Sequence, residues 1–597
     1  MNDKENLADR GFAAEPIYMS DMDRCRPGSA LSPDAMRGRW RMIDYETDTL
    51  SGVMLTAGSE TDAPELTYAL PVSGWHAISI GTWMMKDWYL DTGDSLELRV
   101  KLSGEQTFSV MGLPVVPPPT KPLVEWDRWT GGEELQESFW KVADLTGQEL
   151  VLGQMAWRVA TGDGPGSLRC SPATIAYIKL VPLSDAEVSA WQADRKRTDT
   201  RRLFAHNDFN YPSTVEEIRR HIEPFRNSDF SRIYFEGGSG DLLSYASNIG
   251  RIPTHDGLDD FFYQGPRIGA ENWRSLRERG VDPFQVALDY THEIGLEVHT
   301  CFRVAGFHSP PPLDYEDYGS TFYDAHPELR GVDRNGNLTP RMAFSYPETR
   351  RYVISLLREM AGYDIDGICL LYNRRPPLVE YEPPLIDGFK AEYGEDPRQL
   401  DESDPRWLSY RARILTQFMR EVRQAMDAVA EEKGRSKRIE ITAITMRNEE
   451  ENLVNGMDLQ AWVDEGLVDT LIPFTSEPNL NHQAEAWTDV TKVDYFLSLT
   501  RGTSCRLAPG IQPSELSAEG YRRRADALYK AGVESLFFWW ADLGSNANYK
   551  GSWSALRRLG NQEEIEAWVK AGEPSLAAPT MTVRKLGDWL TSYVTPG

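Results

Sequence analysis

The stretch that decides the fold is DIDGICLLYNRRP, residues 364–376. Its apolar run ICLL ends abruptly in Tyr372, Asn373 and Arg374, and a proline then prevents the strand from continuing. A buried strand that delivers hydrogen-bonding side chains at its C-terminal end is typical of a (β/α)8 barrel, where active sites are built at that edge. We therefore expect a parallel barrel whose functional residues follow its strands.

The sequence around this stretch alternates apolar strand candidates with amphipathic helices from about residue 200 onward. Pro347 opens a helix with one apolar face, and a second, longer face begins at Trp407 and repeats to Val429. Together the strands predict one closed barrel over residues 196–572. The eight strands are expected at 202–207, 231–236, 296–302, 366–372, 438–445, 468–474, 505–509 and 533–540.

The first third of the chain has a different pattern of apolar and polar residues. Residues 66–72 and 96–102 alternate apolar and polar positions, residues 174–183 are similar, and Gly, Pro and Asp punctuate the runs. This pattern predicts an antiparallel β-sandwich over residues 37–195, with a jelly-roll-like arrangement. Residues 1–36 are expected to form a loosely held arm, and residues 573–597 to pack back on the sandwich.

Composition excludes several classes of protein. The chain has 597 residues, with 91 acidic against 64 basic side chains and a net charge of −27, which disfavours nucleic acid and anionic membranes as partners. No apolar run reaches membrane length and the first residues lack a secretory signal, so we expect a cytoplasmic protein. Five scattered cysteines fit buried free thiols. No ligand spacing suggests a metal site or a cofactor.

Four segments in order resemble the glycosyl-hydrolase-like 10 family of bacterial (β/α)8 proteins: VDPFQVALDYTHEIGLEVHTCFR (281–303), FYDAHPELRGVDRNGN (322–337), SYPETRRYVISLLREMAGYDIDGI (345–368) and GMDLQAWVDEGLVDTLIPFTSEP (456–478). The likeness covers roughly residues 200 to 545. It implies a barrel related to retaining glycoside hydrolases, and a glycoside or oligosaccharide as the partner. The family usually continues its DGI motif with an aspartate three residues after the isoleucine, but Leu371 stands there in this sequence.

Glycoside cleavage requires two carboxyl groups in different environments. The predicted strand ends supply four candidates. Glu236 follows an apolar strand and precedes two glycines that let a ligand approach, although a Gly-rich turn with a capping acid has the same pattern. Glu449 follows the fifth strand in a run of three glutamates that also suits a solvated turn, Glu477 precedes a proline after the sixth strand, and Asp542 follows a ring-rich strand.

Other strand-end residues are candidates for holding substrate. Hydroxyl and carboxylate groups of a sugar are bound by amide, guanidinium and ring side chains. Trp539 and Trp540 could form a platform for a sugar ring or belong to the barrel core. His299 fits an interior histidine, and Asp366 is expected to be structural. The predicted substrate-binding residues are His206, Asn207, Asp208, Arg303, Tyr372, Asn373, Arg374, Trp539 and Trp540.

The leading interpretation is a glycoside hydrolase that uses carboxylate acid/base catalysis, with Glu236 and either Glu477 or Glu449 as the pair. One alternative is a carbohydrate-binding barrel that lost cleavage with the fourth-strand aspartate. Another is a lyase or isomerase on the same scaffold, with Tyr372, His206 or Arg303 as its base or electrostatic partner.

Overall fold

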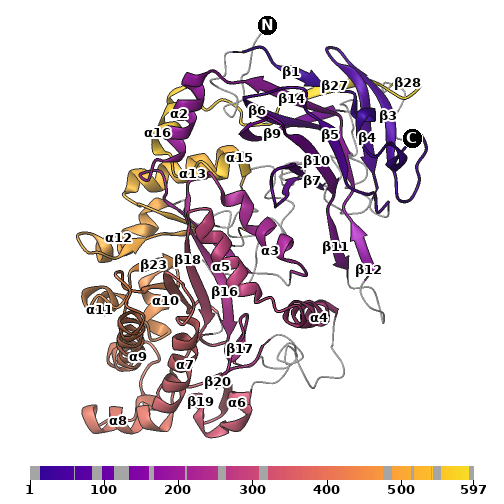
Figure 1. The fold of residues 1–597 in the computed structure, drawn as a ribbon. Helices are drawn as coiled ribbons and strands as arrows, with labels where there is room; N and C mark the ends of the chain where they lie inside the picture. The colour runs from indigo at the N-terminus through magenta and orange to yellow at the C-terminus, as the bar shows by residue number, and fades with distance from the viewer. Residues whose placement is uncertain are drawn as a thin grey trace.

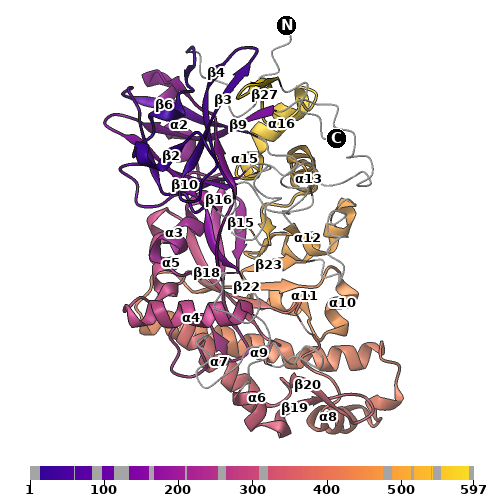
Figure 2. The ribbon, with the colours of Figure 1, turned by 90° about the vertical axis from the view of Figure 1, so that its right-hand side faces the viewer.

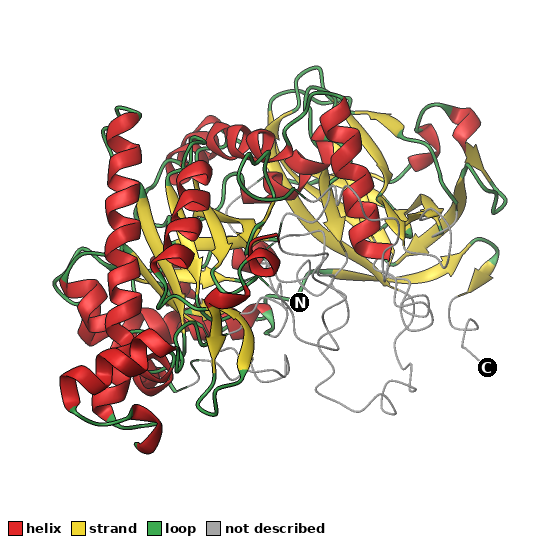
Figure 3. Cartoon of the chain, turned by 90° about the horizontal axis from the view of Figure 1, so that it is seen from below, coloured by secondary structure: helices red, strands yellow, loops and turns green. Residues whose placement is uncertain are grey.

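The computed structural model shows a mixed α/β protein with an antiparallel β domain and a parallel sheet covered by helices (Figures 1 and 2). Seen from below, the strand-rich domain and the helix-rich part lie beside one another (Figure 3). The structure describes residues 14–58, 61–83, 97–112, 134–159, 167–208, 212–252, 264–307, 321–374, 376–474, 487, 489–511, 516–539, 541 and 553–590.

The parallel sheet follows the strand order that the sequence predicts. Each strand pairs with the next along the chain, and β26 pairs with β15 at the other side. The seventh strand is split: β24 pairs with β23, whereas β25 pairs with β26, so the ladder returns to its own beginning. The strands are β15 (Leu203–Asn207), β16 (Phe230–Ser239), β18 (Glu297–Arg303), β21 (Gly367–Leu371), β22 (Glu440–Thr445), β23 (Thr470–Pro473), β24 (Arg506–Leu507), β25 (Gly510–Ile511) and β26 (Leu536–Phe538).

Helices cover the outer face of this sheet (Figure 2). The apolar faces expected at Pro347 and Trp407 belong to α7 and α9, and both faces are buried. No helix in the described ranges is long and apolar enough to cross a membrane. The helices are α3 (Val215–Ile222), α4 (Gln264–Glu278), α5 (Pro283–Glu293), α6 (Thr321–Ala325), α7 (Pro347–Met360), α8 (Pro383–Tyr393), α9 (Pro405–Glu432), α10 (Glu449–Val454), α11 (Leu459–Asp464), α12 (Asp494–Thr500), α13 (Ala518–Ala531), α15 (Trp553–Leu556) and α16 (Gln562–Lys570).

Alternate side chains of the parallel strands fill the interior of the barrel. At the N-terminal end the fully buried guanidinium of Arg232 on β16 lies 2.7 Å from Glu297 and 2.7 Å from Glu440 on β22. Its reach from the second strand to the fifth shows that it crosses the interior. An apolar cluster lies above these charges: Phe204, Tyr234, Cys301, Cys369, Leu371, Ile444, Ile472, Phe474, Ala508, Phe537 and Trp539.

The β domain contains a ten-stranded and a four-stranded antiparallel sheet, and their jelly-roll arrangement stays a prediction. The larger sheet contains β1 (Ile17–Met19), β14 (Tyr177–Pro182), β6 (Trp75–Trp83), β9 (Glu134–Asp144), β27 (Thr580–Leu586), β3 (Trp40–Thr47), β4 (Ser51–Ala57) and β13 (Ala173–Ile175), with β2 (Leu31–Ser32) and β28 (Trp589–Leu590) at its side. The smaller sheet contains β5 (Leu66–Ala69), β10 (Glu149–Gln154), β7 (Glu97–Leu102) and β8 (Ser109–Gly112).

Both ends of the described chain enter this domain. β27 pairs with β9 on one side and β3 on the other, and Figure 1 shows the yellow C-terminal strands among the indigo N-terminal ones. The expectation of a loosely held arm is wrong for residues 17–32. Met19, Met22 and Cys25 are buried in the core of the domain, because β1 pairs with β14 and the turn that follows brings apolar side chains inward.

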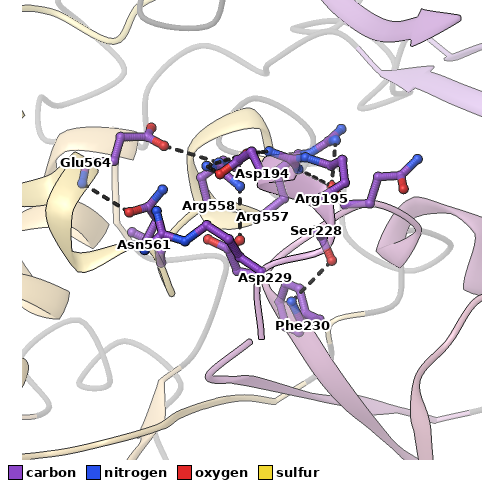
Figure 4. Close-up of polar contacts among 12 residues, drawn as sticks. Asp194, Arg195, Ser228, Asp229, Phe230, Arg557, Arg558, Asn561 and Glu564 are labelled. Atoms are coloured by element: carbon purple, nitrogen blue, oxygen red, sulfur yellow. Dashed lines mark hydrogen bonds and ion pairs between the residues drawn. The ribbon is translucent and has the colours of Figure 1, made fainter. Parts of the chain in front are cut away.

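A charged network joins the linker helix α2 (Asp185–Arg195) to the barrel (Figure 4). Arg558 lies 3.1 Å from Asp194 in α2, 3.1 Å from Asp229 at the start of β16 and 3.1 Å from Glu564 in α16. Arg195 pairs with Asp194 and donates to the Asn227 carbonyl. A single guanidinium thus connects three elements that are distant in the sequence.

Asp229 makes this junction sensitive to pH. Burial raises the pKa of Asp229 from 3.8 to about 6, although Arg558 and Arg195 oppose that shift. The folded protein therefore binds this proton more tightly than the unfolded chain does. Asp229 contributes its full stabilisation below pH 3.8, and this stabilisation is lost as the pH rises through 6. We expect Asp229→Asn to remove about 3 kcal/mol of pH dependence between pH 4 and 7.

This expectation is checked by urea unfolding of wild type and Asp229→Asn at several pH values. Asp48→Asn is the matched control, since Asp48 pairs with Arg584 at 2.9 Å on the exposed surface. Parallel pH profiles for wild type and Asp229→Asn would contradict the assignment.

Candidate functional site

The first strand brings two of the predicted residues to the barrel mouth. Phe204 lies in the interior cluster, and side chains alternate along a strand, so His206 and Asp208 also point inward. Asn207 points to the opposite side and is fully buried. Its burial on that side does not favour contact with substrate, and the binding role of Asn207 stays a prediction.

The second strand places Glu236 beside them. Tyr234 lies in the interior cluster, and Glu236 is the next inward position. The pairing of β16 with β18 shifts its register between Glu236 and Gly238. A Cβ atom at Gly237 would lie 2.0 Å from the Thr300 Cγ2 atom, so only glycine fits this crossing. The glycine pair thus shapes the strand end that carries the acid.

The third strand supplies the counter-charge. Arg303 Nε donates to Glu236 Oε1 over 3.1 Å, and its Nη2 atom lies 3.8 Å from Asp208 Oδ1. His206 Nε2 lies 3.5 Å from Glu236 Oε2, and His206 Nδ1 lies 3.6 Å from Asp208 Oδ1. The four residues form a closed ring of alternating acids and bases, which we call the charge ring: Asp208, His206, Glu236 and Arg303.

The ring shifts the protonation of its members. Burial by itself raises the pKa of Glu236, but the charges of Arg303 and His206 outweigh it and hold that pKa below its usual value. Burial lowers the pKa of His206, but contacts with Cys301, Glu236 and Asp208 outweigh burial and raise it to about 10. Glu236 is consequently an anion and His206 a cation at neutral pH. An ionised acid of this kind suits a nucleophile or base better than a proton donor.

Trp539 packs against the charge ring on the side of the barrel interior. Its ring stacks on that of His206, with centroids 4.0 Å apart and planes 5° apart, and the Arg374 guanidinium lies 5.0 Å from its centroid. Only 1% of Trp539 is exposed. Trp539 is thus packed inside the barrel, and a sugar platform at this residue stays a prediction. Arg374 reaches across from the fourth strand to cover this tryptophan.

The fourth strand differs from expectation at two positions. Tyr372 is fully buried against α9, where its hydroxyl lies 3.0 Å from Met419 Sδ. This contact turns Tyr372 toward the helix layer, and its predicted substrate-binding role stays a prediction. Leu371 points into the barrel, opposite Arg303 in the ladder, and belongs to the interior cluster. Asn373 lies two residues past the end of β21 and is 4% exposed.

The remaining catalytic candidates do not join the charge ring within the described residues. Glu449 is exposed in the first turn of α10. Burial raises the pKa of Tyr495 in α12, and the charge of Glu449 raises it further. Glu477, Asp542 and Trp540 lie outside the described residues. His299 is fully buried, and burial together with the charge of Arg232 lowers its pKa, so it is a neutral interior histidine. Asp366 accepts from the Val298 backbone at the start of β21, a structural role.

Two features escaped the analysis of the sequence. Cys301 contacts His206 and thereby supports the ring, but a cysteine inside a strand carries no signal for such a contact. Glu382 precedes α8 and is fully buried, and burial raises its pKa to about 7. The signal for Glu382 is an acid directly before Pro383 and Pro384, the pattern of a helix start.

The charge ring also bears on metal binding. His206, Asp208 and Glu236 offer ligand atoms within 4.8 Å of one another. Arg303 already holds one oxygen of Glu236, and its positive charge would repel a cation placed between the acids. The donor set therefore fits paired charges better than a metal ion.

Comparison with known proteins gives a family match for part of the chain. Residues 261–498 match the model of the family described as Glycosyl hydrolase-like 10. This confirms the resemblance inferred from the sequence, over a shorter range than expected. No curated protein matches the chain.

Solved structures of glycoside-cleaving enzymes are distantly similar. The catalytic domain of β-amylase from Paenibacillus polymyxa aligns with a TM-score of 0.40 and 11% identity, over 61% of this chain and 98% of its own. An α-galactosidase from Thermus thermophilus aligns with a TM-score of 0.33 and 11% identity, over 88% and 94%. The glycoside hydrolase domain of PelA from Pseudomonas aeruginosa aligns with a TM-score of 0.29 and 12% identity, over 58% and 96%. Such distant matches say nothing about the activity of this chain.

Arg303→Gln tests the charge ring directly. The substitution leaves Glu236 with one cation instead of two, and we expect the free energy of unfolding to fall by roughly 2 kcal/mol at pH 7. Because its pKa is lowered in the folded protein, Glu236 stabilises the fold at pH values above its usual pKa. This stabilisation is lost as the pH falls. The difference between the two proteins should therefore shrink towards pH 3.

The matched control is Arg506→Gln, which removes a more exposed guanidinium 3.4 Å from Glu440. Urea unfolding should show a loss below about 1 kcal/mol for this variant. Equal losses for both substitutions would contradict the special role of the ring.

A chelator should leave the protein unchanged if the ring holds no metal ion. We expect the melting temperature of the purified protein to move by less than about 1 °C on addition of EDTA, and likewise on addition of Ca²⁺ or Zn²⁺. A larger stabilisation by either ion, lost in Asp208→Asn, would show that a cation displaces Arg303.

Proposed function

We propose that this protein is a glycoside hydrolase in which Glu236 acts as the ionised carboxylate, either as nucleophile or as the base that activates water. The observation that carries the proposal is the position of Glu236: a carboxylate with 12% of its side chain exposed, held by Arg303 at 3.1 Å, at the C-terminal end of a barrel strand. The match of residues 261–498 to a glycosyl-hydrolase-like family supports it.

The geometry allows Glu236 to stabilise positive charge on a sugar ring. Cleavage passes through an oxocarbenium-like transition state, and a carboxylate that stays ionised lowers the energy of that state. Arg303 donates a hydrogen bond to one oxygen of Glu236, and His206 lies 3.5 Å from the other. The acid is therefore partly oriented before substrate binds.

The proton donor is a separate group in this proposal. Asp208 has an oxygen within 4.8 Å of Glu236, close to the 5–5.5 Å of retaining pairs. However, Asp208 already faces two bases, His206 at 3.6 Å and Arg303 at 3.8 Å, and we propose that it serves the charge ring and does not donate the proton. Glu477 and Asp542 therefore remain the proposed donors, and both follow strands that end at the same edge.

A second candidate function is sugar binding without cleavage. It is favoured by Leu371, which is fully buried inside the barrel at the position where the resembled family carries an aspartate. For the lyase or isomerase alternative, one of its three proposed residues, Tyr372, is buried against Met419, whereas His206 and Arg303 belong to the charge ring.

Hydrolysis of nitrophenyl glycosides and oligosaccharides by wild type and Glu236→Gln tests the proposal. We expect the variant to lose at least ~100-fold in kcat/KM, because an amide can act neither as nucleophile nor as base. Azide should restore turnover to Glu236→Gly, since a small anion can occupy the space of the lost carboxylate.

Glu449→Gln is the matched control, because Glu449 is exposed on α10 and does not touch the ring. It should retain wild-type turnover. Turnover unaffected by Glu236→Gln would overturn the role of that residue, and sugar binding without any turnover would favour the second candidate.

A further inference from the structure

Asn373 has an unsatisfied amide in a place where the fold leaves little access to water. It is 4% exposed, and neither its Nδ2 nor its Oδ1 atom has a hydrogen-bond partner in the described part of the chain. A buried amide without partners is costly, and native proteins normally avoid it. Another buried asparagine, Asn452, follows that rule: it accepts from the Met446 amide and donates to the carbonyls of Met446 and Asn448.

The surroundings of Asn373 show where the missing partners belong. It lies two residues after β21, whose last residue Leu371 pairs with Arg303 in the ladder. The next residue, Arg374, lies over Trp539, which stacks on His206, so Asn373 is at the strand end beside the charge ring. One third of the Arg303 side chain and 22% of that of Asp208 are exposed, so the charge ring is open to solvent. Leu371 supplies an apolar floor below.

We propose that Asn373 is a ligand-binding and specificity-determining residue whose carboxamide holds two neighbouring hydroxyl groups of a pyranose. Nδ2 donates to one hydroxyl oxygen, and Oδ1 accepts from the adjacent hydroxyl. The inference rests on the proposed function for the nature of the ligand as a sugar, but it does not require that the sugar is cleaved. A site built to bind hydroxyls rejects analogues that lack them, because its own polar atoms are then left without partners.

This role implies a conflict between stability and binding at one residue. Asn373→Leu keeps the branched shape and removes both unpaired polar atoms, so the free protein should become more stable while sugar binding weakens. We expect its melting temperature to rise by about 1 to 3 °C. Asn452→Leu is the matched control: it removes an amide whose bonds are made, and should lower the melting temperature.

Binding is measured by calorimetry with the methyl glycosides of glucose, galactose and mannose and with their 2-deoxy and 3-deoxy analogues. All proteins carry Glu236→Gln, so that turnover does not interfere. At least one glycoside should bind, lose at least ~10-fold in affinity with Asn373→Leu, and be preferred over a deoxy analogue only when Asn373 is present.

Three results would overturn the inference: no binding of any of the three glycosides, binding that is insensitive to Asn373→Leu, or destabilisation comparable to that of Asn452→Leu. If Asn373→Leu does not fold, Asn373→Ser is used instead, and failure of both to fold would show a structural amide. If the protein hydrolyses a glycoside but Asn373→Leu does not change its sugar affinity, the proposed function is retained and the role of Asn373 is rejected. If the protein with Glu236 binds a sugar through Asn373 but does not cleave it, the role of Asn373 is retained and the proposed hydrolase function is rejected.

Discussion

The inward side chains of β15, β16 and β18 share one enclosed space, and their charges have to balance there. Two acids and two bases meet at this point, and each acid lies between the two bases at 3.1 to 3.8 Å. Removing charges from water costs several kcal/mol for each ion, so such a group is tolerable only when every charge has a partner. The alternating ring meets this condition, and it keeps Glu236 ionised where an isolated buried acid would take up a proton.

The same constraint operates at the other end of the barrel. Arg232 is fully buried, and Glu297 and Glu440 neutralise it from two different strands. Between the two charged layers lie mainly apolar side chains and the neutral His299. Apolar side chains thus separate the charge cluster of Arg232 from the charge ring at the C-terminal ends of the strands. Low dielectric between the layers strengthens the pairing within each of them.

The β domain depends on strands from both ends of the chain. β1 and β27 enter one sheet although more than five hundred residues separate them in the sequence. Arg558 then ties the linker helix to the barrel, so the C-terminal part of the chain contacts both regions. This arrangement couples the position of the two regions to a few buried charges, among them Asp229, whose pKa burial raises.

The sequence by itself determined the strands of the barrel, the antiparallel texture of the first third and the position of Glu236, Asp208 and Arg303 at strand ends. These features depend on local periodicity and on neighbours within a few residues, which a sequence displays directly. It also marked Leu371 as a departure from the resembled family. Only the tertiary structure decided which strand-end residues face the barrel. Tyr372, Asn207 and Trp539 were expected to meet substrate, and the structure buries all three, because stacking on His206 and packing against α9 depend on partners distant in the sequence. For the same reason the pairing of Arg303 with Glu236, 67 residues apart, follows from the ladder register and not from any local pattern.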